Sequence, residues 1–365
     1  MTTAPARAQR RLLPGLADGM LKVASVLVTP VLPQDYLDMV APLRSGADLR
    51  GRIVEVRRET VDAVTLVIKP GRSWQGHRPG QYIRMGIDID GVRHWRAYSL
   101  TSALADDGLI SITTKRIPDG VVSSHLVSAA RPGTLVHLDQ AAGDFVLPAQ
   151  LPAKILFLTA GSGITPVMGM LRNLPAAHDS DIVLLHSAPR PQDVIFAHEL
   201  AALDRAGSVR VRLRHTDTDG LLDLARLADE VPDWAEREAW VCGPTGLLDA
   251  AEMHWGEAGV LEQLHVERFR PTVVEPGEGG QIVFARTGRA VDADGATPIL
   301  DAGEDAGILM KSGCRMGICF GCVVPLRAGA VRDLRTGEIT RADEGSALSI
   351  QTCVNAVAGQ CDLDL

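Results

Sequence analysis

Four cysteines near the C-terminus have the side chains and the spacing to bind a metal centre. Cys314, Cys319 and Cys322 follow one another as C-x4-C-x2-C, and Cys353 comes after a long gap. Thiolates bind zinc and iron–sulfur clusters, and two thiols can instead close a disulfide. Structural zinc sites usually carry two C-x2-C pairs, whereas here one such pair follows a third cysteine at a five-residue step.

The spacing is the one found in plant-type ferredoxins, in which four thiolates hold a [2Fe–2S] cluster. Gly313, Gly317 and Gly321 leave the backbone of this loop free to wrap closely and to point amide groups at sulfur. Disulfides are disfavoured because the sequence shows no export signal. We therefore expect the four cysteines to bind a [2Fe–2S] cluster and the chain to carry electrons.

A second group of residues has the chemistry to bind a flavin nucleotide. The tetrapeptide Arg96-Ala97-Tyr98-Ser99 is followed about twenty residues later by the turn Gly120-Val121-Val122-Ser123-Ser124. An arginine can neutralise a pyrophosphate, a tyrosine ring can lie against a flavin, and a serine hydroxyl can reach a ring nitrogen. The turn can open a helix whose N–H groups face the same pyrophosphate. The alternative for Tyr98 is an ordinary place in a strand core.

A third group lies where a dinucleotide would bind. Gly161-Ser162-Gly163-Ile164-Thr165-Pro166 follows an apolar run at 154–158, which is the position where a pyrophosphate meets a helix N-terminus. Pro166 replaces the third glycine of G-x-G-x-x-G and suits the first turn of a helix. The turn Cys242-Gly243-Pro244 ends a later strand at the same edge. A buried structural thiol is the ordinary interpretation of Cys242, but its place beside this turn favours the active site.

The elements that must position these residues fall into three domains. Short alternating runs separated by Gly and Pro turns predict strands at 53–56, 63–68, 81–85, 109–114 and 135–138, and hence an antiparallel barrel over residues 48–149. Residues 150–270 alternate strands (154–158, 181–186, 209–213, 239–242) with helices such as 166–173, which predicts a parallel, doubly wound α/β domain. Residues 271–280 indicate a linker, and residues 281–365 an α+β domain with a hairpin at 281–291 and a short helix after Thr297-Pro298.

Composition limits the class of partner and the location. The 365 residues are 46% hydrophobic and 22% charged, as in ordinary globular proteins, and the net charge of −8 argues against nucleic acid as the main partner. The cysteine usage fits a reducing, cytoplasmic location. Residues 1–47 form a basic arm with an apolar stretch too short to span a bilayer. We expect this arm to be partly helical and to pack on the body, and peripheral contact with the inner face of the membrane is the alternative.

Taken together, these motifs resemble the ferredoxin–NADP reductase superfamily over residues 48–365. With its trailing ferredoxin-like domain, the chain is similar to the iron–sulfur flavoprotein reductases that serve bacterial oxygenases and desaturases. The segment 77–102 most resembles reductases paired with membrane fatty-acyl desaturases. In reductases without such a trailing domain, a terminal aromatic often covers the flavin, and here Phe269 precedes the linker.

The resemblance implies three cofactors, a β-grasp fold for the last domain, and roles for particular residues. It implies that FAD lies on the barrel against Arg96, Ala97, Tyr98, Ser99, Val122 and Ser123. It implies that NADPH or NADH binds at Gly161, Ser162, Gly163, Thr165, Gly243 and Pro244, with Ser99 and Cys242 as the catalytic residues and Thr165 and Cys242 near the nicotinamide.

The expected reaction is stepwise electron transfer. A reduced nicotinamide delivers two electrons as a hydride, whereas a [2Fe–2S] cluster accepts one, and a flavin can take up two and release them singly. The expected path runs from NAD(P)H through FAD and the cluster to a terminal acceptor, a diiron fatty-acyl desaturase or hydroxylase. The alternatives are the reductase of a Rieske dioxygenase or P450 monooxygenase and, in another class, an iron–sulfur redox sensor or a self-contained haem oxygenase.

The choice of coenzyme depends on cations near the adenine ribose, because the extra 2′-phosphate of NADPH favours arginine. Arg190 and Arg214 follow or lie on neighbouring candidate strands, and we expect them to select NADPH. Asp217 and Asp219 lie close in sequence and would repel a phosphate. The alternative is that both arginines are ordinary surface charges.

Overall fold

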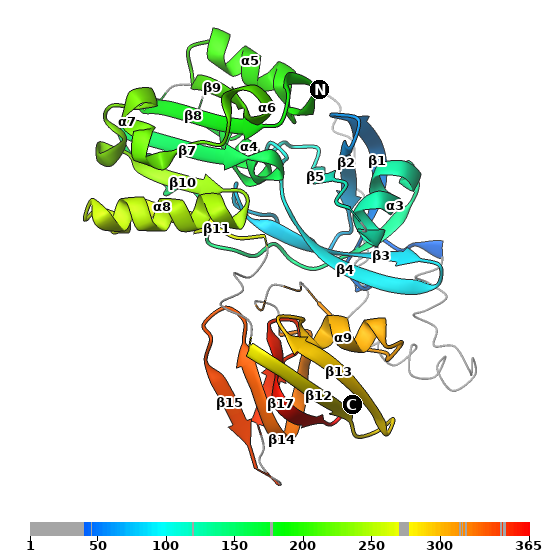
Figure 1. Cartoon of the computed structure of the whole chain (residues 1–365). Helices are drawn as coiled ribbons and strands as arrows, with labels where there is room; N and C mark the ends of the chain where they lie inside the picture. The colour runs from blue at the N-terminus through cyan, green and yellow to red at the C-terminus, as the bar shows by residue number, and fades with distance from the viewer. Residues whose placement is uncertain are drawn as a thin grey trace, which may run out of the picture.

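A computed structural model describes residues 40–44, 46–118, 120–175, 178–269, 277–313, 315, 317, 320–343, 345 and 348–365. These residues form three domains in chain order (Figure 1). Most of the predicted N-terminal arm, residues 1–39, lies outside the described residues, so its conformation stays a prediction. Among the helices that are described, none combines the length and the apolar character needed to cross a bilayer.

The first domain is the expected antiparallel barrel. Its sheet has the strand order β4-β3-β6-β1-β2-β5, and every pairing in it is antiparallel. Alternating apolar side chains fill its interior, with Ile53, Leu66 and Ile83 fully buried. Helix α3 (Val121–Ala129) buries Val122 and Leu126 against this core. The strands are β1 (Arg50–Arg58), β2 (Ala63–Pro70), β3 (Tyr82–Ile89), β4 (Val92–Ser99), β5 (Ile110–Lys115) and β6 (Leu135–Leu138).

The second domain is the expected parallel sheet with helices on both faces. Its strand order is β11-β10-β7-β8-β9. Phe157 of β7 packs into the core on one face and Leu158 into the core on the other, which is why this strand is apolar throughout. The strands are β7 (Lys154–Ala160), β8 (Asp181–Ala188), β9 (Arg210–His215), β10 (Glu238–Cys242) and β11 (Leu264–Glu267), and the helices are α4 (Ile164–Leu171), α5 (Ala197–Arg205), α6 (Thr216–Asp219), α7 (Leu227–Glu230) and α8 (Thr245–Glu257).

These two domains share a close interface. A Cβ on Gly169 of α4 would lie 2.3 Å from the carbonyl oxygen of Leu100, so the helix touches the end of the barrel sheet directly. Just beyond α4, Arg172 donates hydrogen bonds to the Thr101 carbonyl and to Glu199, and the Asn173 amide donates to the Ser102 carbonyl. These contacts fix the parallel sheet against the barrel and thereby define the space between them.

The third domain is the expected α+β fold around a mixed sheet. The strand order is β13-β12-β17-β14-β15 with β16 beside β14, and β12 pairs with β17 in parallel while the other pairs are antiparallel. The predicted hairpin and the short helix after Pro298 are confirmed. The elements are β12 (Gly277–Phe284), β13 (Arg289–Gly295), α9 (Ile299–Asp305), β14 (Val323–Asp333), β15 (Ile339–Ala342), β16 (Leu348–Gln351) and β17 (Asn355–Leu363).

The boundary of this domain differs from the sequence prediction. Residues 277–280, assigned to the linker because of their glycines, form the start of β12. A Cβ on Gly280 would lie 1.5 Å from the carbonyl oxygen of Gly359 in β17. These glycines therefore allow close strand packing and an irregular pairing with β13, which is a structural use rather than the flexibility of a linker.

Candidate functional site

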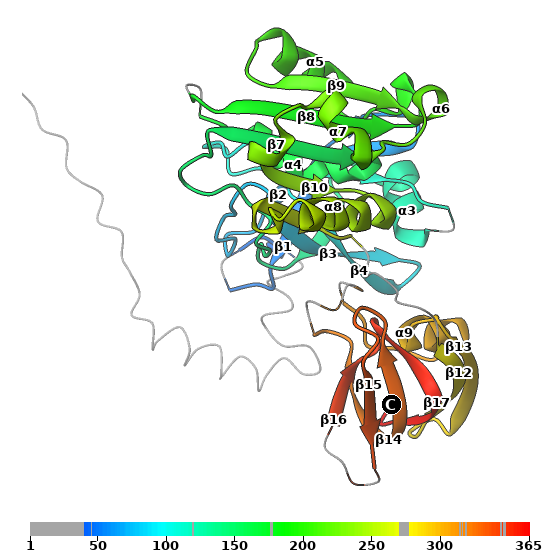
Figure 2. The same cartoon turned by 60° about the vertical axis from the view of Figure 1, so that its left-hand side comes forward.

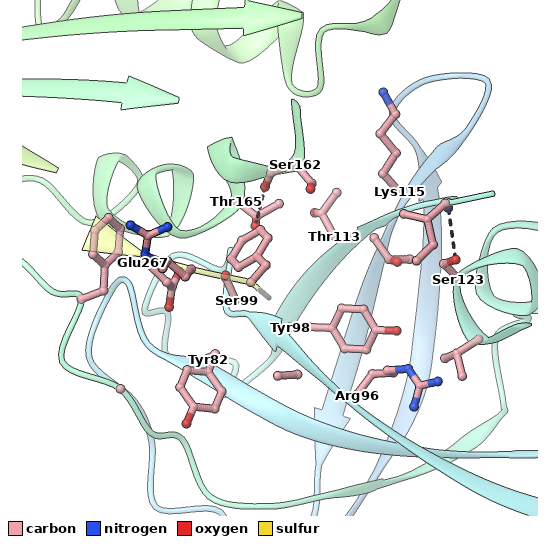
Figure 3. A pocket seen from close by; sticks show the side chains of 18 of the residues that line it. Tyr82, Arg96, Tyr98, Ser99, Thr113, Lys115, Ser123, Ser162, Thr165 and Glu267 are labelled. Carbon is pink, nitrogen blue, oxygen red and sulfur yellow. Dashed lines mark hydrogen bonds between the residues drawn. The ribbon is translucent and has the colours of Figure 1, made fainter. Parts of the chain in front are cut away.

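A cavity of about 810 Å³ lies where the barrel meets the parallel sheet (Figure 3). One wall comes from β4, β5 and the start of α3, and the other from the start of α4, from β11 and from the residues after β11. In Figure 3, Arg96, Ser123 and Lys115 lie toward one end, Glu267 lies at the other, and Tyr98 and Ser99 lie between them. A space of this size and shape suits an extended nucleotide cofactor.

All six barrel residues that the resemblance assigns to FAD line this cavity. Burial raises the pKa of the Tyr98 phenol to about 12, so its ring is neutral. Burial lowers the pKa of Arg96, and the positive charge of Arg315 lowers it further. Among the described residues, Arg96 donates to the Trp95 carbonyl at 2.8 Å and forms no ion pair with a carboxylate, which leaves its charge available for a phosphate. The residues are Arg96, Ala97, Tyr98, Ser99, Val122 and Ser123.

The start of α3 is shaped to admit a phosphate. A Cβ on Gly120 would lie 2.4 Å from Ile117 Cγ1 and 2.5 Å from Ser123 Oγ, so only glycine fits. The helix has no side-chain cap, and its first N–H groups therefore remain for a ligand. The Ser123 hydroxyl accepts a hydrogen bond from the Ile117 N–H (3.2 Å) and donates to the Gly120 carbonyl (3.3 Å). Ser123 thus stabilises the turn as well as lining the cavity.

The second wall carries part of the expected dinucleotide motif. Residues 161–163 form a 3₁₀ turn between β7 and α4, and Pro166 lies in the first turn of α4 as predicted. Ser162 and Thr165 line the cavity, and the Thr165 hydroxyl donates to the Ser162 carbonyl at 2.9 Å. A Cβ on Gly163 would lie 2.0 Å from the carbonyl oxygen of Cys242. The turn therefore packs directly on the Cys242-Gly243-Pro244 segment at the carboxyl edge of the sheet.

Cys242 itself lies behind the cavity wall. Cys242 is fully buried in a core that includes Ile164 and Trp240. It is not among the described residues that line the cavity. Burial and the neighbouring Glu267 raise the pKa of the Cys242 thiol well above its ordinary value. The thiol is therefore neutral. The cavity lining also leaves out Gly161, Gly163, Gly243 and Pro244. Gly161 and Gly163 flank Ser162, which does line the cavity.

Glu267 is a site residue that the sequence did not identify. It ends β11 opposite Cys242 in the β10–β11 pairing and lines the cavity. Burial raises the pKa of its carboxyl to about 8, and the nearby Ser99 hydroxyl offsets part of that shift. Glu267 Oε2 and Ser99 Oγ are both buried, and neither has a hydrogen bond of acceptable geometry among the described residues. Buried polar atoms normally have partners, so this end of the cavity is suited to a ligand with polar edges.

Arg190 and Arg214 lie beyond this cavity, at the carboxyl edge of β8 and β9. The Arg190 Nε donates to Asp193 Oδ2 at 2.8 Å, and Asp217 lies 3.9 Å from the same nitrogen. Arg214 donates to the Gly220 carbonyl at 2.9 Å and lies 3.9 Å from Glu230. Both arginines are therefore already paired with acidic or carbonyl groups, and a phosphate would have to compete for them.

Two of the four expected cluster ligands come together in the third domain. The sulfur atoms of Cys322 and Cys353 lie 3.1 Å apart, and both residues are buried. Gly317, which lies between α9 and Cys322 in the chain, has a φ of 75°. Its carbonyl accepts hydrogen bonds from Gln351 and Arg335. This convergence of two buried thiols fits a [2Fe–2S] site. Cys314 and Cys319 lie outside the described residues.

Comparison with known proteins assigns one family model to each domain. An oxidoreductase FAD-binding domain matches residues 52–147, an oxidoreductase NAD-binding domain matches residues 157–253, and a 2Fe-2S iron-sulfur cluster binding domain matches residues 283–357. These matches cover the barrel, the parallel sheet and the cysteine loop, respectively. The FAD, NAD(P)H and [2Fe–2S] cofactors expected from the sequence are thus confirmed at the level of domains.

Individual relatives are similar to this chain over most of its length. An NADPH oxidoreductase of Mycobacterium tuberculosis is 51% identical over 352 residues, which are 94% of this chain and 91% of the relative. The glycine betaine monooxygenase reductase subunit of Pseudomonas aeruginosa is 30% identical over 83% of this chain and 91% of its own length. The solved structure of phthalate dioxygenase reductase has the same fold, with a TM-score of 0.60 and 21% identity over 87% of this chain and 97% of that one.

Proposed function

We propose a function from the premise that this chain belongs to the iron–sulfur flavoprotein reductases of the ferredoxin–NADP reductase superfamily. The enzyme is an NAD(P)H-dependent oxidoreductase. In our proposal it oxidises NADPH at FAD, passes the electrons singly to a [2Fe–2S] cluster, and delivers them to a terminal diiron desaturase or hydroxylase.

The observation that supports this proposal most strongly is the shared cavity. Its two walls belong to the domains that match FAD-binding and NAD-binding models, so donor and acceptor of a hydride can meet in one space. When bound there, the flavin takes up two electrons and releases them one at a time. Arg96 would offset the pyrophosphate charge, and the neutral Tyr98 ring would cover one side of the flavin.

The residues at the far end of the cavity, and Cys242 behind its wall, have a positioning role in this proposal. Cys242 and Glu267 are neutral near pH 7 because burial raises the pKa of each. A neutral thiol, a neutral carboxyl and the Ser99 hydroxyl favour an uncharged nicotinamide ring and exclude bulk water. Ser162 and Thr165 would lie against the nicotinamide side. Hydride transfer needs no general base, and none is assigned.

The start of α3 favours FAD over FMN. Its uncapped N–H groups beside Gly120 offer a site for a second phosphate, which FMN lacks. Acid release of the flavin followed by chromatography tests this. A single FMN peak would contradict the proposal.

Two lines of support bear on the acceptor. The segment 77–102 resembles reductases of fatty-acyl desaturases, and the P. aeruginosa relative is the reductase of a monooxygenase. The desaturase is the acceptor that we propose, and a Rieske or P450 oxygenase is the alternative. The test is aerobic turnover with NADPH and a candidate diiron desaturase, scored by unsaturated acyl product, in parallel with a Rieske oxygenase component. Product with the Rieske component alone would refute the desaturase assignment.

NADPH is the coenzyme that we propose, supported by the name of the M. tuberculosis relative. Arg190 and Arg214 would exchange their present partners for the 2′-phosphate. We expect a higher kcat/KM for NADPH than for NADH. The substitutions Arg190→Ala and Arg214→Ala should lower kcat/KM for NADPH more than for NADH. Arg210→Ala is the matched control, because Arg210 pairs with Asp181 at the start of β8, away from the carboxyl edge. Equal losses for both coenzymes would refute these roles.

We also propose that the enzyme acts in the cytoplasm and that residues 1–47 pack on its body, with contact with the inner face of the membrane as the alternative. The test is co-sedimentation of the full chain with anionic and neutral vesicles, against a variant lacking residues 1–39. Equal sedimentation of the two proteins would refute membrane contact through the arm.

A further inference from the structure

Helix α9 is bound by a compact set of charges to Arg315, a residue of the loop that carries the cysteines. Arg315, which directly follows Cys314, donates to Asp301 Oδ1 at 2.8 Å and to the two Glu304 oxygens at 2.5 and 2.6 Å. Arg315 is only 22% exposed, and its φ of 60° is one that side chains other than glycine rarely adopt. Charge-assisted hydrogen bonds from one guanidinium to two carboxylates can hold a residue in such a conformation. We call Arg315, Asp301 and Glu304 the α9 triad.

The α9 triad also faces the barrel. Burial lowers the pKa of both His94 and Arg96 on β4, and the positive charge of Arg315 lowers both further, whereas Glu304 acts in the opposite direction on both. Burial raises the pKa of the Asp301 carboxyl, and the positive charge of Arg96 offsets part of that rise. Figures 1 and 2 agree in placing α9 beside β4, although these elements lie 200 residues apart in the chain.

This arrangement links the two redox sites through side chains. Arg96 lines the flavin cavity, and Arg315 belongs to the cysteine loop. Without the two carboxylates, three cationic or protonatable groups would face one another across the domain boundary: His94, Arg96 and Arg315. Like charges at such a boundary favour separation, and Asp301 and Glu304 convert this repulsion into attraction.

We propose that the α9 triad docks the cluster-binding domain on β4 and thereby positions the cysteine loop to receive electrons from the flavin cavity. With both cofactors bound, NADPH would supply two electrons, and these would pass singly from the flavin to the cluster, the second after an acceptor has reoxidised the cluster. The triad residues are positioning residues, and their role does not depend on which acceptor the enzyme serves.

The test separates docking from chemistry at the flavin. Asp301→Asn, Glu304→Gln and the double variant are prepared as holoproteins and mixed anaerobically with NADPH in a stopped-flow instrument. We expect flavin reduction at the wild-type rate, and reduction of the cluster that is slower by about tenfold or more, because a small misplacement of redox centres is costly. High salt should slow the same step in the wild type, since it screens the charges.

A second readout does not involve turnover. Small-angle X-ray scattering of the oxidised holoproteins should give a larger radius of gyration for the double variant than for the wild type. Asp305→Asn is the matched control, because it removes the same charge from an exposed position on the same helix. It should change neither the rate of cluster reduction nor the scattering.

Three outcomes would overturn the proposal. One is a wild-type rate of cluster reduction in the double variant, provided that the absorption of the cluster shows that the variant still carries it. Another is an equal slowing in Asp305→Asn, which would indicate a general charge effect. The third is loss of the cluster from Asp301→Asn and Glu304→Gln, which would assign the triad to folding of the cysteine loop instead. Arg315→Lys keeps the charge but loses the second guanidinium nitrogen that binds the other carboxylate, and its rate of cluster reduction should fall between those of the wild type and the double variant.

Discussion

At the scale of single residues, Glu267 is the group whose behaviour depends most on its surroundings. Its carboxyl has a pKa raised from 4.5 to about 8 because it is buried beside Ser99 and opposite Cys242. The folded protein therefore holds this proton over a pH range in which the unfolded chain has released it. Stability must then fall as pH rises from about 4.5 to about 8, by about 1.4 kcal/mol per pH unit from this group, and level off above that range.

Glu267→Gln should remove this fall in stability with rising pH. In thermal unfolding of the flavin-free protein, the melting temperature of the variant minus that of the wild type should grow from pH 5 to pH 8.5. Glu252→Gln, at a more exposed carboxyl that pairs with Arg268, is the matched control for the loss of a glutamate charge. A difference that shrinks with rising pH would mean that Glu267 is ionised in the folded protein.

The cysteines give a second prediction at this scale, because Cys353 and Cys361 lie in the same buried core. Cys353→Ser should abolish the visible absorption of the cluster and the reduction of cytochrome c, while flavin and ferricyanide reduction remain. Cys361→Ser should keep the cluster and lose about 1–3 kcal/mol of stability from the buried hydroxyl. If Cys361→Ser instead removes the cluster, the assignment of the ligands is wrong.

The sequence identified the chemistry of single residues unevenly. Cys314, Cys319, Cys322 and Cys353 have a spacing that is itself the signal, so the cluster-binding domain was predictable. Glu267 had no such signal, because its shifted pKa arises only when β11 packs against β10 and the barrel. The full burial of Cys242 behind the cavity wall likewise depends on how the Gly163 turn covers it.

At the scale of elements, the turn between β7 and α4 shows how closely the nucleotide-binding segments pack. Gly163→Ala would bring a methyl group to 2.0 Å from the carbonyl oxygen of Cys242. We expect a loss of about 1–3 kcal/mol, as for other overpacked sites, together with a higher KM for NADPH. Calorimetry and steady-state kinetics measure the two effects.

Gly246→Ala is the control for this prediction. Gly246 lies in α8 with open space around its Cα, so alanine there should be neutral or stabilising by about 0.4–1 kcal/mol. A Gly163→Ala protein as stable as the wild type would show that the turn can move away from β10 at little cost.

Strands were predictable from the sequence where most of their residues are apolar. The strands β2, β7 and β8 are strongly apolar, and their positions agree with the prediction to within two residues at each end. The strand β11 was missed because it has only four residues, all half-buried. The start of β12 was missed because Gly277, Gly279 and Gly280 read as a linker in sequence, whereas their close approach to β13 and β17 is a tertiary feature.

At the scale of the whole molecule, Arg172 joins the first two domains. It forms an ion pair with Glu199 at 2.6 Å, donates to the Thr101 carbonyl of the barrel, and lies 4.8 Å above the Phe196 ring. Arg172→Gln should cost about 1.5–3 kcal/mol, the value of charged hydrogen bonds at a partly buried site. Because both domains line the cavity, FAD should also be released at a lower temperature, which flavin fluorescence reports.

Arg226→Gln is the control at this scale. Arg226 pairs with Asp229 at the surface, and removing such a pair should cost no more than about 1 kcal/mol. Equal effects of the two substitutions on FAD release would show that the Arg172 contacts do not hold the domains together.

The position of β17 also has a consequence for how the protein is made. This strand, at 355–363, is the central strand of its sheet and pairs with β12 on one side and β14 on the other. During translation the cysteine loop is therefore synthesised before the strand that completes its domain. The first two domains can fold and take up FAD while the ribosome is still at work. Insertion of the iron–sulfur cluster into a completed domain therefore requires that residues 355–363 have already left the ribosome.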